Sequence, residues 1–288
     1  MFEFLTDTGS EIDNYLRESL NIGLLRTGVT LKTREIFSDA NWDNVNAFEF
    51  FKDLEEGVVS IYQPAMNYWK DIVEEIFKKG KDVLFLGMSS RFTGGIKNLN
   101  IIKMLLSPIY PDRKLVILDS GLVAGGEKCL VLAVAEYLKD KREEDVEKIA
   151  SEIKIKFLGR GITYWILDSL KFYMKANRGL DSFKDLNIPK GYPIIKSENG
   201  SFFLKGLFNS KEDALEALIG DIKLSSIETL EFTYSPDWDL KKIREVVNQL
   251  ESNLNIIINH NITYQSPSVT AVTGPYSYSI GVLKNVTF

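Results

Sequence analysis

The sequence is poor in the residues that build disulfides and metal centres. Its 288 residues include one cysteine, Cys129, and one histidine, His260. A single cysteine cannot form a disulfide within the chain, and a single histidine excludes a metal site built on two or three histidines. Cys129 lies in an apolar run and is interpreted as a core residue, and His260 as a surface or turn residue. We therefore expect no metal site.

Long apolar runs and an excess of positive charge are also missing. No run of about 18 apolar residues is present, as a membrane-spanning helix would require. Residues 1–7 lack the basic start and the longer apolar stretch of a signal peptide. The net charge is −5, which argues against a general affinity for nucleic acid or for an anionic membrane surface. We expect a cytoplasmic protein with no nucleic-acid partner and no stable membrane insertion.

The length and composition fit a globular protein of two domains. Hydrophobic residues make up 44% of the chain and charged residues 26%, which supports a full apolar core. The pattern of predicted elements changes near residues 159–161. We expect an N-terminal α/β domain over residues 1–159 and a C-terminal α+β domain with a mostly antiparallel sheet over residues 160–288.

In the N-terminal half, short apolar strands alternate with helices. Strands predicted at residues 2–5, 82–87 and 114–118 each end in a polar turn that leads into a helix. This alternation predicts a parallel sheet with helices on both faces, where ligands bind beyond the carboxyl ends of the strands. The polar turns expected along that edge are Thr6-Asp7-Thr8, Ser89-Ser90 and Asp119-Ser120.

The stretch Ser89-Ser90-Arg91-Phe92-Thr93-Gly94-Gly95 is the most informative of these turns. It joins the strand at 82–87 to a helix predicted from about Lys97 to Leu106. The first N–H groups of a helix lack partners and can bind an anion, while glycines let the ligand approach the backbone and hydroxyls add donors. We interpret this stretch as the clamp for a ligand's head group. The alternative is an ordinary strand-to-helix turn.

Other elements are predicted from local patterns. Pro64 fits the first turn of a helix that continues to Phe77. The apolar side chains expected in the core rather than around a ligand are Phe85, Phe92, Ile101, Met104, Trp165, Phe172 and Met174. The remaining expectations are strands at 22–31, 162–167, 229–234, 256–259 and 277–283, a hairpin over 192–204, and helices at 11–20, 45–54, 168–176, 211–218 and 240–254.

Several short motifs, in this order and spacing, resemble those of the DegV family of bacterial fatty-acid-binding proteins. The motifs are Thr6-Asp7-Thr8, Glu35-Ile36-Phe37-Ser38-Asp39, Ile61-Tyr62-Gln63-Pro64, Ser89 to Gly95, Asp119-Ser120 with Gly125-Gly126, Leu170 to Asn177-Arg178, and Gly274-Pro275-Tyr276. The resemblance runs over nearly the whole chain.

The resemblance implies a DegV-like two-domain α/β fold that holds a long-chain fatty acid in a tunnel between the domains. Hydroxyls of two loops would hold the carboxylate. The protein would present this ligand to a fatty-acid kinase and catalyse nothing itself, with no cofactor beyond the bound acid. The expected lipid-binding residues are Ser60, Ile61, Tyr62, Ser89, Ser90, Arg91, Thr93, Gly94, Gly95, Ser120, Val272 and Gly274.

The sequence departs from the family pattern at several of these positions. Ile61 stands in a pair that normally carries hydroxyls and cannot donate a hydrogen bond, and the Tyr62 hydroxyl lies farther from the backbone. Gly95 replaces a threonine, and Val272 stands where a histidine is usual. Asn209 falls at the position of a hairpin arginine that members of the family are expected to use in contacts with the kinase.

Arg91 replaces a glycine of the family pattern. It is either solvated or supplies a positive charge to the ligand's head group.

Two other functions stay open at this point. The first is a divergent paralogue with a regulatory or interaction role. The second is an enzyme that acts on a small phosphorylated or acidic substrate and uses Ser89 to Gly95 as a phosphate cradle. The sequence lacks the Gly-x-x-x-x-Gly-Lys-Ser/Thr motif, and Asp7 and Asp119 are the only carboxylates near the loop that could take part.

Overall fold

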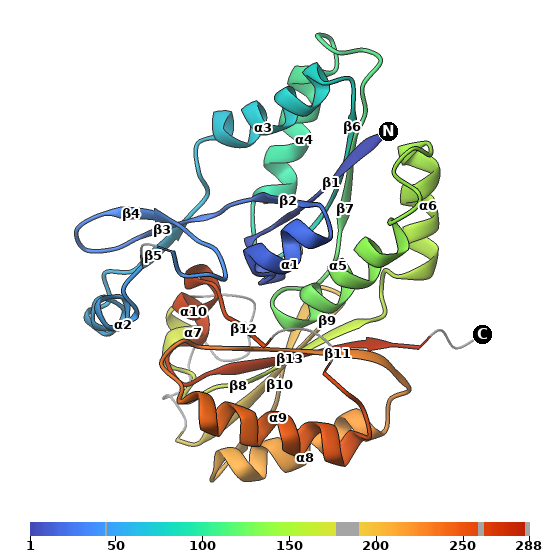
Figure 1. Ribbon diagram of the computed structural model, residues 1–288. Helices are drawn as coiled ribbons and strands as arrows, with labels where there is room; N and C mark the ends of the chain where they lie inside the picture. Colours follow the sequence, from blue (N-terminus) through green and yellow to red (C-terminus); the bar gives the residue numbers. More distant parts are fainter. Residues whose placement is uncertain (44, 177–189, 259–261, 286–288) are drawn as a thin grey trace.

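The computed structural model describes residues 1–43, 45–176, 190–258 and 262–285. Two sheets form its upper and lower parts in Figure 1, with a small third sheet at the side. The sequence interpretations of His260, of Asn177-Arg178 and of Asn259 lie outside the described residues.

The N-terminal sheet is parallel and has the strand order β2-β1-β6-β7. Its strands are β1 (Phe2–Asp7), β2 (Ile22–Leu25), β6 (Asp82–Gly87) and β7 (Leu115–Asp119). Successive side chains point to opposite faces: Leu5 and Phe85 pack against α3 (Met66–Lys78) and α4 (Gly95–Leu106). Phe4 and Leu84 pack on the other face against α5 (Gly125–Tyr137) and α6 (Val146–Lys156). The predicted parallel sheet with helices on both faces is confirmed.

The C-terminal sheet has the strand order β10-β9-β8-β13-β11-β12. Its strands are β8 (Gly161–Ile166), β9 (Tyr192–Glu198), β10 (Ser201–Phe208), β11 (Ile227–Tyr234), β12 (Thr263–Tyr264) and β13 (Tyr278–Lys284). All neighbouring pairs are antiparallel except β11 and β12. Helices α8 (Lys211–Lys223) and α9 (Leu240–Leu254) cover one face. The mostly antiparallel sheet is therefore also confirmed.

Helix α5 joins the two halves, because it packs on both sheets (Figure 1). Its first turn touches the C-terminal sheet directly: Gly125 N donates to Ser279 Oγ at 3.1 Å and Gly126 N to Thr163 Oγ1 at 3.1 Å. A Cβ on Gly281 would lie only 1.8 Å from Gly125 O. Glycine at position 281 is what lets the helix backbone lie against the strand.

A small antiparallel sheet, β4-β3-β5, stands at the side of the molecule. Its strands are β3 (Gly28–Thr30), β4 (Glu35–Phe37) and β5 (Ser60–Tyr62). It packs with α2 (Ala47–Glu56), α7 (Lys171–Lys175) and α10 (Pro267–Thr273) around a separate apolar cluster. This sheet and α10 bring residues from both ends of the chain together.

The structure corrects some local predictions. The expected helix over 11–20 is a 3-10 turn at Thr8–Ser10 followed by α1 (Asn14–Ser19), because Asp7 and Asp13 each cap a separate segment. The expected strand over 22–31 is split into β2 and β3. β4 lies within residues 32–42, where no strand was predicted.

The expected strand at 256–258 is not formed. Ile256 N and Ile258 N both bond to Glu251, through its backbone and its side chain, so these groups finish α9 instead of pairing with a strand. Pro64 lies just before α3 rather than in its first turn. The predicted domain boundary, between residues 159 and 160, falls in the connection from α6 to β8 and stays a prediction. Within the described ranges, no helix combines the length and the apolar character needed to cross a membrane.

Candidate functional site

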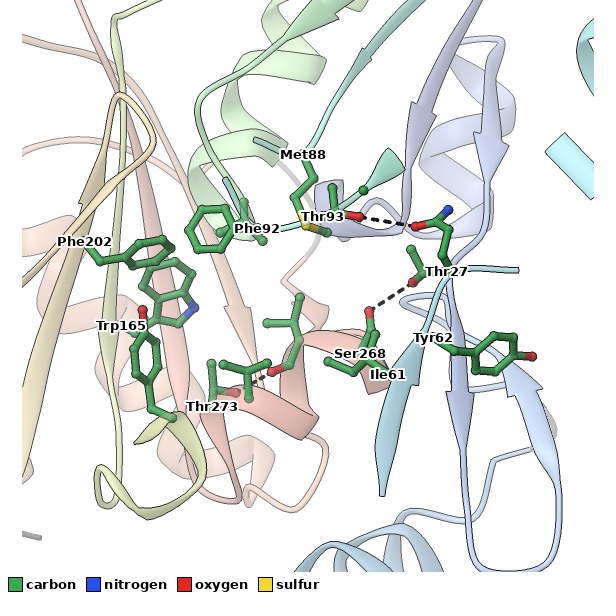
Figure 2. Close-up of a pocket in the computed structure, with 16 residues that line it drawn as sticks. Thr27, Ile61, Tyr62, Met88, Phe92, Thr93, Trp165, Phe202, Ser268 and Thr273 are labelled. Atoms are coloured by element: carbon green, nitrogen blue, oxygen red, sulfur yellow. Dashed lines mark hydrogen bonds between the residues drawn. The ribbon is translucent and has the colours of Figure 1, made fainter. Parts of the chain in front are cut away.

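A cavity of about 150 Å³ lies between the N-terminal loops and the C-terminal sheet (Figure 2). This is several times the space that one water molecule needs, so it is more than a packing defect. Its walls come from the loops after β2, β6 and β7, from β5, β8 and β10, and from α7 and α10. The lining residues are Thr27, Ile61, Tyr62, Gln63, Met88, Phe92, Thr93, Gly94, Val123, Trp165, Tyr173, Phe202, Ser268, Val269, Val272 and Thr273.

One side of the cavity carries a cluster of hydroxyl groups. Ser38 Oγ donates to Ser268 Oγ at 3.0 Å, and Thr27 Oγ1 donates to the same atom at 3.4 Å. Ser268 N in turn donates to Ser38 Oγ at 2.9 Å. Thr27 and Ser268 line the cavity, whereas Ser38 lies buried behind them. The cluster offers neutral donors and acceptors to a polar group in the cavity.

The start of α4 adds a second polar group to this side. Thr93 Oγ1 donates to Gln63 Oε1 at 3.3 Å and accepts from Gly95 N at 3.2 Å. The Gln63 side-chain nitrogen is buried and has no hydrogen-bond partner among the residues that the structure describes. Figure 2 shows the Thr93 and Thr27 hydroxyls on the same side of the cavity.

The opposite side of the cavity is aromatic. Phe202 stacks on Trp165, with ring centroids 5.9 Å apart, and meets Phe92 edge to face at 3.9 Å. Met88 and Val269 belong to the same apolar cluster. Such a surface binds hydrocarbon by removing it from water.

Among the described residues that line the cavity, none carries a charge. A buried carboxyl group, that of Asp7, accepts from the backbone N of the cavity-lining residue Met88 at 2.9 Å and from Gly9 N at 2.8 Å. Burial raises the pKa of Asp7 to about 6. Burial raises the pKa of its neighbour Glu127 well above the usual value, and the negative charge of Asp7 adds to this effect.

The carboxyl groups at the sheet edge hold loops in place. Asp119 accepts from Ser90 N at 3.1 Å and from Gly121 N at 2.9 Å. The Ser120 hydroxyl accepts from Leu122 N at 3.0 Å. The polar turns of the parallel strands thus meet along one edge, as predicted, and their side chains cap the backbone around the cavity.

A family model described as an uncharacterised protein of the DegV family matches residues 1–285. This chain belongs to the DegV family. A DegV domain-containing protein of Clostridium acetobutylicum is 25% identical over 218 residues, which are 75% of this chain and 74% of that protein. A DegV domain-containing protein of Streptococcus pyogenes serotype M1 is 21% identical and covers 98% of both chains.

Several solved structures, some of them described as DegV proteins, share the whole fold. A stearic-acid-binding protein from Eubacterium ventriosum superposes with a TM-score of 0.83 at 16% identity, over 99% of this chain and 98% of its own. A DegV family protein from Eubacterium eligens, loaded with heptadecanoic acid, has a TM-score of 0.82 at 11% identity, over 99% and 100%. The fatty-acid-binding DegV of Bacillus subtilis has a TM-score of 0.79 at 16% identity, over 98% and 99%.

The residues predicted to bind lipid fall into two groups, according to whether they line the cavity. Those that line the cavity are Ile61, Tyr62, Thr93, Gly94 and Val272. Those that lie outside its lining are Ser60, Ser89, Ser90, Arg91, Gly95, Ser120 and Gly274. Their part in lipid binding stays a prediction.

The side chains of Tyr62 and Arg91 point in directions that the sequence analysis did not consider. The Tyr62 ring covers Gly28, where a Cβ would lie 2.1 Å from it, and Figure 2 shows its hydroxyl turned away from the cavity. Burial and the nearby Glu35 raise the pKa of Tyr62. Arg91 reaches the β9–β10 hairpin instead, where its Nη1 donates to Ser201 Oγ at 3.4 Å.

Sequence reasoning also missed residues of the cavity. Thr27, Ser268 and Thr273 were not predicted, and Gln63 was noted only as part of a motif. A serine followed by proline, as at Ser266-Pro267, is a helix-start signal that could have revealed α10.

One of the expected core side chains is wrong, since Met104 is 74% exposed. Trp165 and Phe92 belong to an apolar cluster, as predicted, and also line the cavity.

Proposed function

We propose that this protein binds a long-chain fatty acid in the cavity between its domains. The observation that carries the proposal is the division of this cavity into a hydroxyl side, with Thr27, Thr93 and Ser268, and an aromatic side, with Trp165 and Phe202. The carboxyl group lies on the hydroxyl side, near the loop from Ser89 to Gly95. The hydrocarbon chain packs along the aromatic side. The fatty acids bound by the neighbouring DegV structures support this reading.

The energetics favour a ligand that is mostly hydrocarbon. Each buried methylene group contributes roughly 0.8 kcal/mol, so a chain of about fifteen would supply on the order of 10 kcal/mol before the costs of binding if all of its methylenes were buried. The head group therefore sets the position of the ligand more than its affinity. Because no charged side chain lines the cavity in the described part of the chain, the acid binds in its neutral form or with a raised pKa.

We further propose that the protein is a carrier and not an enzyme. The carboxyl groups of Asp7 and Asp119, the candidates for acid–base chemistry, accept hydrogen bonds from backbone N–H groups. They stabilise the loops around the cavity and do not line it. The partner consistent with a carrier is a fatty-acid kinase that phosphorylates the presented carboxyl group.

The test is native mass spectrometry of protein purified from its expression host, followed by extraction and identification of the bound lipid. One fatty acid per chain is expected. A protein that stays empty when offered saturated, unsaturated and branched acids would contradict the proposal. Addition of a bacterial fatty-acid kinase and ATP to the loaded protein then tests delivery, which should consume one ATP per bound acid.

A further inference from the structure

The buried tryptophans differ in the hydrogen-bond partners of their indole N–H groups. Trp42 Nε1 donates to Gln265 O at 2.6 Å, and Trp69 Nε1 donates to Arg26 O at 2.9 Å. Trp165 is buried to a similar degree, with 3% of its surface exposed. Its Nε1 has no hydrogen-bond partner among the residues that the structure describes. Buried indole N–H groups usually have a partner. Trp238 Nε1 also lacks one among the described residues, but of these two tryptophans only Trp165 lines the cavity.

Trp165 lies on the cavity wall opposite the hydroxyl groups. It stands on β8, with Phe202 stacked on its ring. Figure 2 shows the indole nitrogen on the side of the ring that faces the cavity, and the hydroxyls of Thr27 and Ser268 across from it. The Trp165 N–H is thus a polar group at a place separate from the hydroxyls of Thr27 and Ser268, and Tyr173 and Thr273 add further hydroxyl groups to the lining.

A simple hydrocarbon chain satisfies only one of these places. Its carboxyl group can bond the hydroxyl side, but the methylenes packed against Trp165 leave the N–H without an acceptor. An unpaired buried donor costs free energy comparable to a lost hydrogen bond. An oxygen atom on the chain at this point would accept from the indole and remove that cost.

We propose that Trp165 Nε1 is a second polar anchor, and that the preferred ligand is a long-chain fatty acid with a hydroxyl or keto oxygen along its chain. This inference rests on the proposed fatty-acid binding and specifies which class of fatty acid the cavity selects. Trp165 acts as a specificity-determining residue, and binding forms no covalent bond.

The experiment compares the affinity of stearic acid with that of hydroxystearic acids whose hydroxyl lies near the carboxyl end, at mid-chain or near the methyl end. Delipidated wild-type protein and Trp165→Phe are titrated by calorimetry. Phenylalanine keeps an aromatic ring for Phe202 and removes the N–H. The matched control is Trp238→Phe, because Trp238 Nε1 also lacks a partner among the described residues but does not line this cavity.

At least one hydroxystearic acid should bind wild-type protein and Trp238→Phe about 2- to 10-fold more tightly than stearic acid. Trp165→Phe should lose this preference and still bind stearic acid. Equal or weaker binding of every hydroxy acid, or a preference that survives in Trp165→Phe, would overturn the inference. Failure of stearic acid and of every hydroxy acid to bind would overturn this inference, and failure of unsaturated and branched acids as well would overturn the proposed function.

A second readout separates the hydrogen bond from a general packing effect. In ¹⁵N-labelled protein each indole N–H gives its own NMR signal, and Trp165→Phe identifies the signal of Trp165. The preferred hydroxy acid should shift this proton downfield relative to the stearic acid complex. An unchanged Trp165 signal would contradict the hydrogen bond.

Discussion

Thr27 and Ser268 are 241 positions apart in the chain, yet Thr27 Oγ1 donates to Ser268 Oγ at 3.4 Å. Thr27 follows β2 of the N-terminal sheet, and Ser268 lies in α10 near the C-terminus. The hydroxyl side of the cavity is therefore assembled from both ends of the chain. A head group held there would contact both, so we expect ligand binding to support the packing of α10 on the N-terminal domain.

Loss of the Ser268 hydroxyl should weaken fatty-acid binding moderately. In Ser268→Ala one neutral hydrogen bond to the head group is lost, which lowers the affinity for stearic acid about 2- to 10-fold. The matched control is Ser90→Ala in the loop before α4, since Ser90 is exposed and does not line the cavity. Titration of both variants decides between the two positions. A larger loss in Ser90→Ala would mean that the ligand lies along the loop and not at Ser268.

The stability of the fold should fall as the pH rises from mildly acidic to mildly alkaline. Burial raises the pKa of Glu11 from 4.5 to about 8, although Thr233, Ser266 N and Lys128 act in the other direction. Between these two values the folded protein holds a proton that the unfolded chain has lost. The stability contributed by the protonated carboxyl is complete below pH 4.5 and is lost as the pH rises through 8.

Between these two pKa values the free energy of unfolding should fall by on the order of 1 kcal/mol per pH unit for such a group. Urea unfolding at several pH values measures it, and Glu11→Gln should flatten the profile. Glu18→Gln, at an exposed position of α1, serves as the control. A profile of Glu11→Gln that matches wild type would show that Glu11 does not hold the extra proton.

The buried pair of Lys128 and Glu231 joins α5 to β11. Lys128 Nζ lies 3.1 Å from Glu231 Oε2, and both side chains are fully buried. Lys128→Met leaves the carboxylate without its counter-charge and should lower the free energy of unfolding by about 3–5 kcal/mol. Lys128→Met combined with Glu231→Leu should recover much of this loss.

Chemical denaturation of the two variants gives the comparison. Lys139→Met, at an exposed pair with Glu136, should change the stability by less than about 1 kcal/mol. A double variant less stable than Lys128→Met would contradict the view that an unpaired charge causes the loss.

The contact between α5 and β13 should tolerate no side chain at position 281. In Gly281→Ala the new Cβ would meet Gly125 O, and the strand and helix must separate. We expect a loss of about 3 kcal/mol or more in the free energy of unfolding. Gly220→Ala is the opposite case, because nothing lies within 4 Å of its Cβ position in α8. It should stabilise the protein by about 0.5–1 kcal/mol, and thermal unfolding can compare the two.

The sequence predicts the parallel sheet well because its signals are local. β1, β6 and β7 are short apolar runs that end in polar turns, and these turns meet at one edge. The position of Thr93 at the cavity follows from the same pattern. These features need no knowledge of distant parts of the chain.

The rest of the site depends on contacts that local patterns do not contain. Tyr62 turns away from the cavity because Gly28, on the neighbouring strand, leaves room for its ring. The pairing of Thr27 with Ser268 requires the two ends of the chain to meet. Trp165 carries the same apolar signal whether it lies in a core or on a cavity wall.

A crystal structure of the protein with stearic acid would test the central claim most directly. We expect density for one acyl chain between the two domains, with its carboxyl group within hydrogen-bond distance of Thr93 or Ser268 and its chain against Phe202 and Trp165. An empty cavity in crystals grown with saturating acid, or an acid bound elsewhere on the protein, would contradict the account.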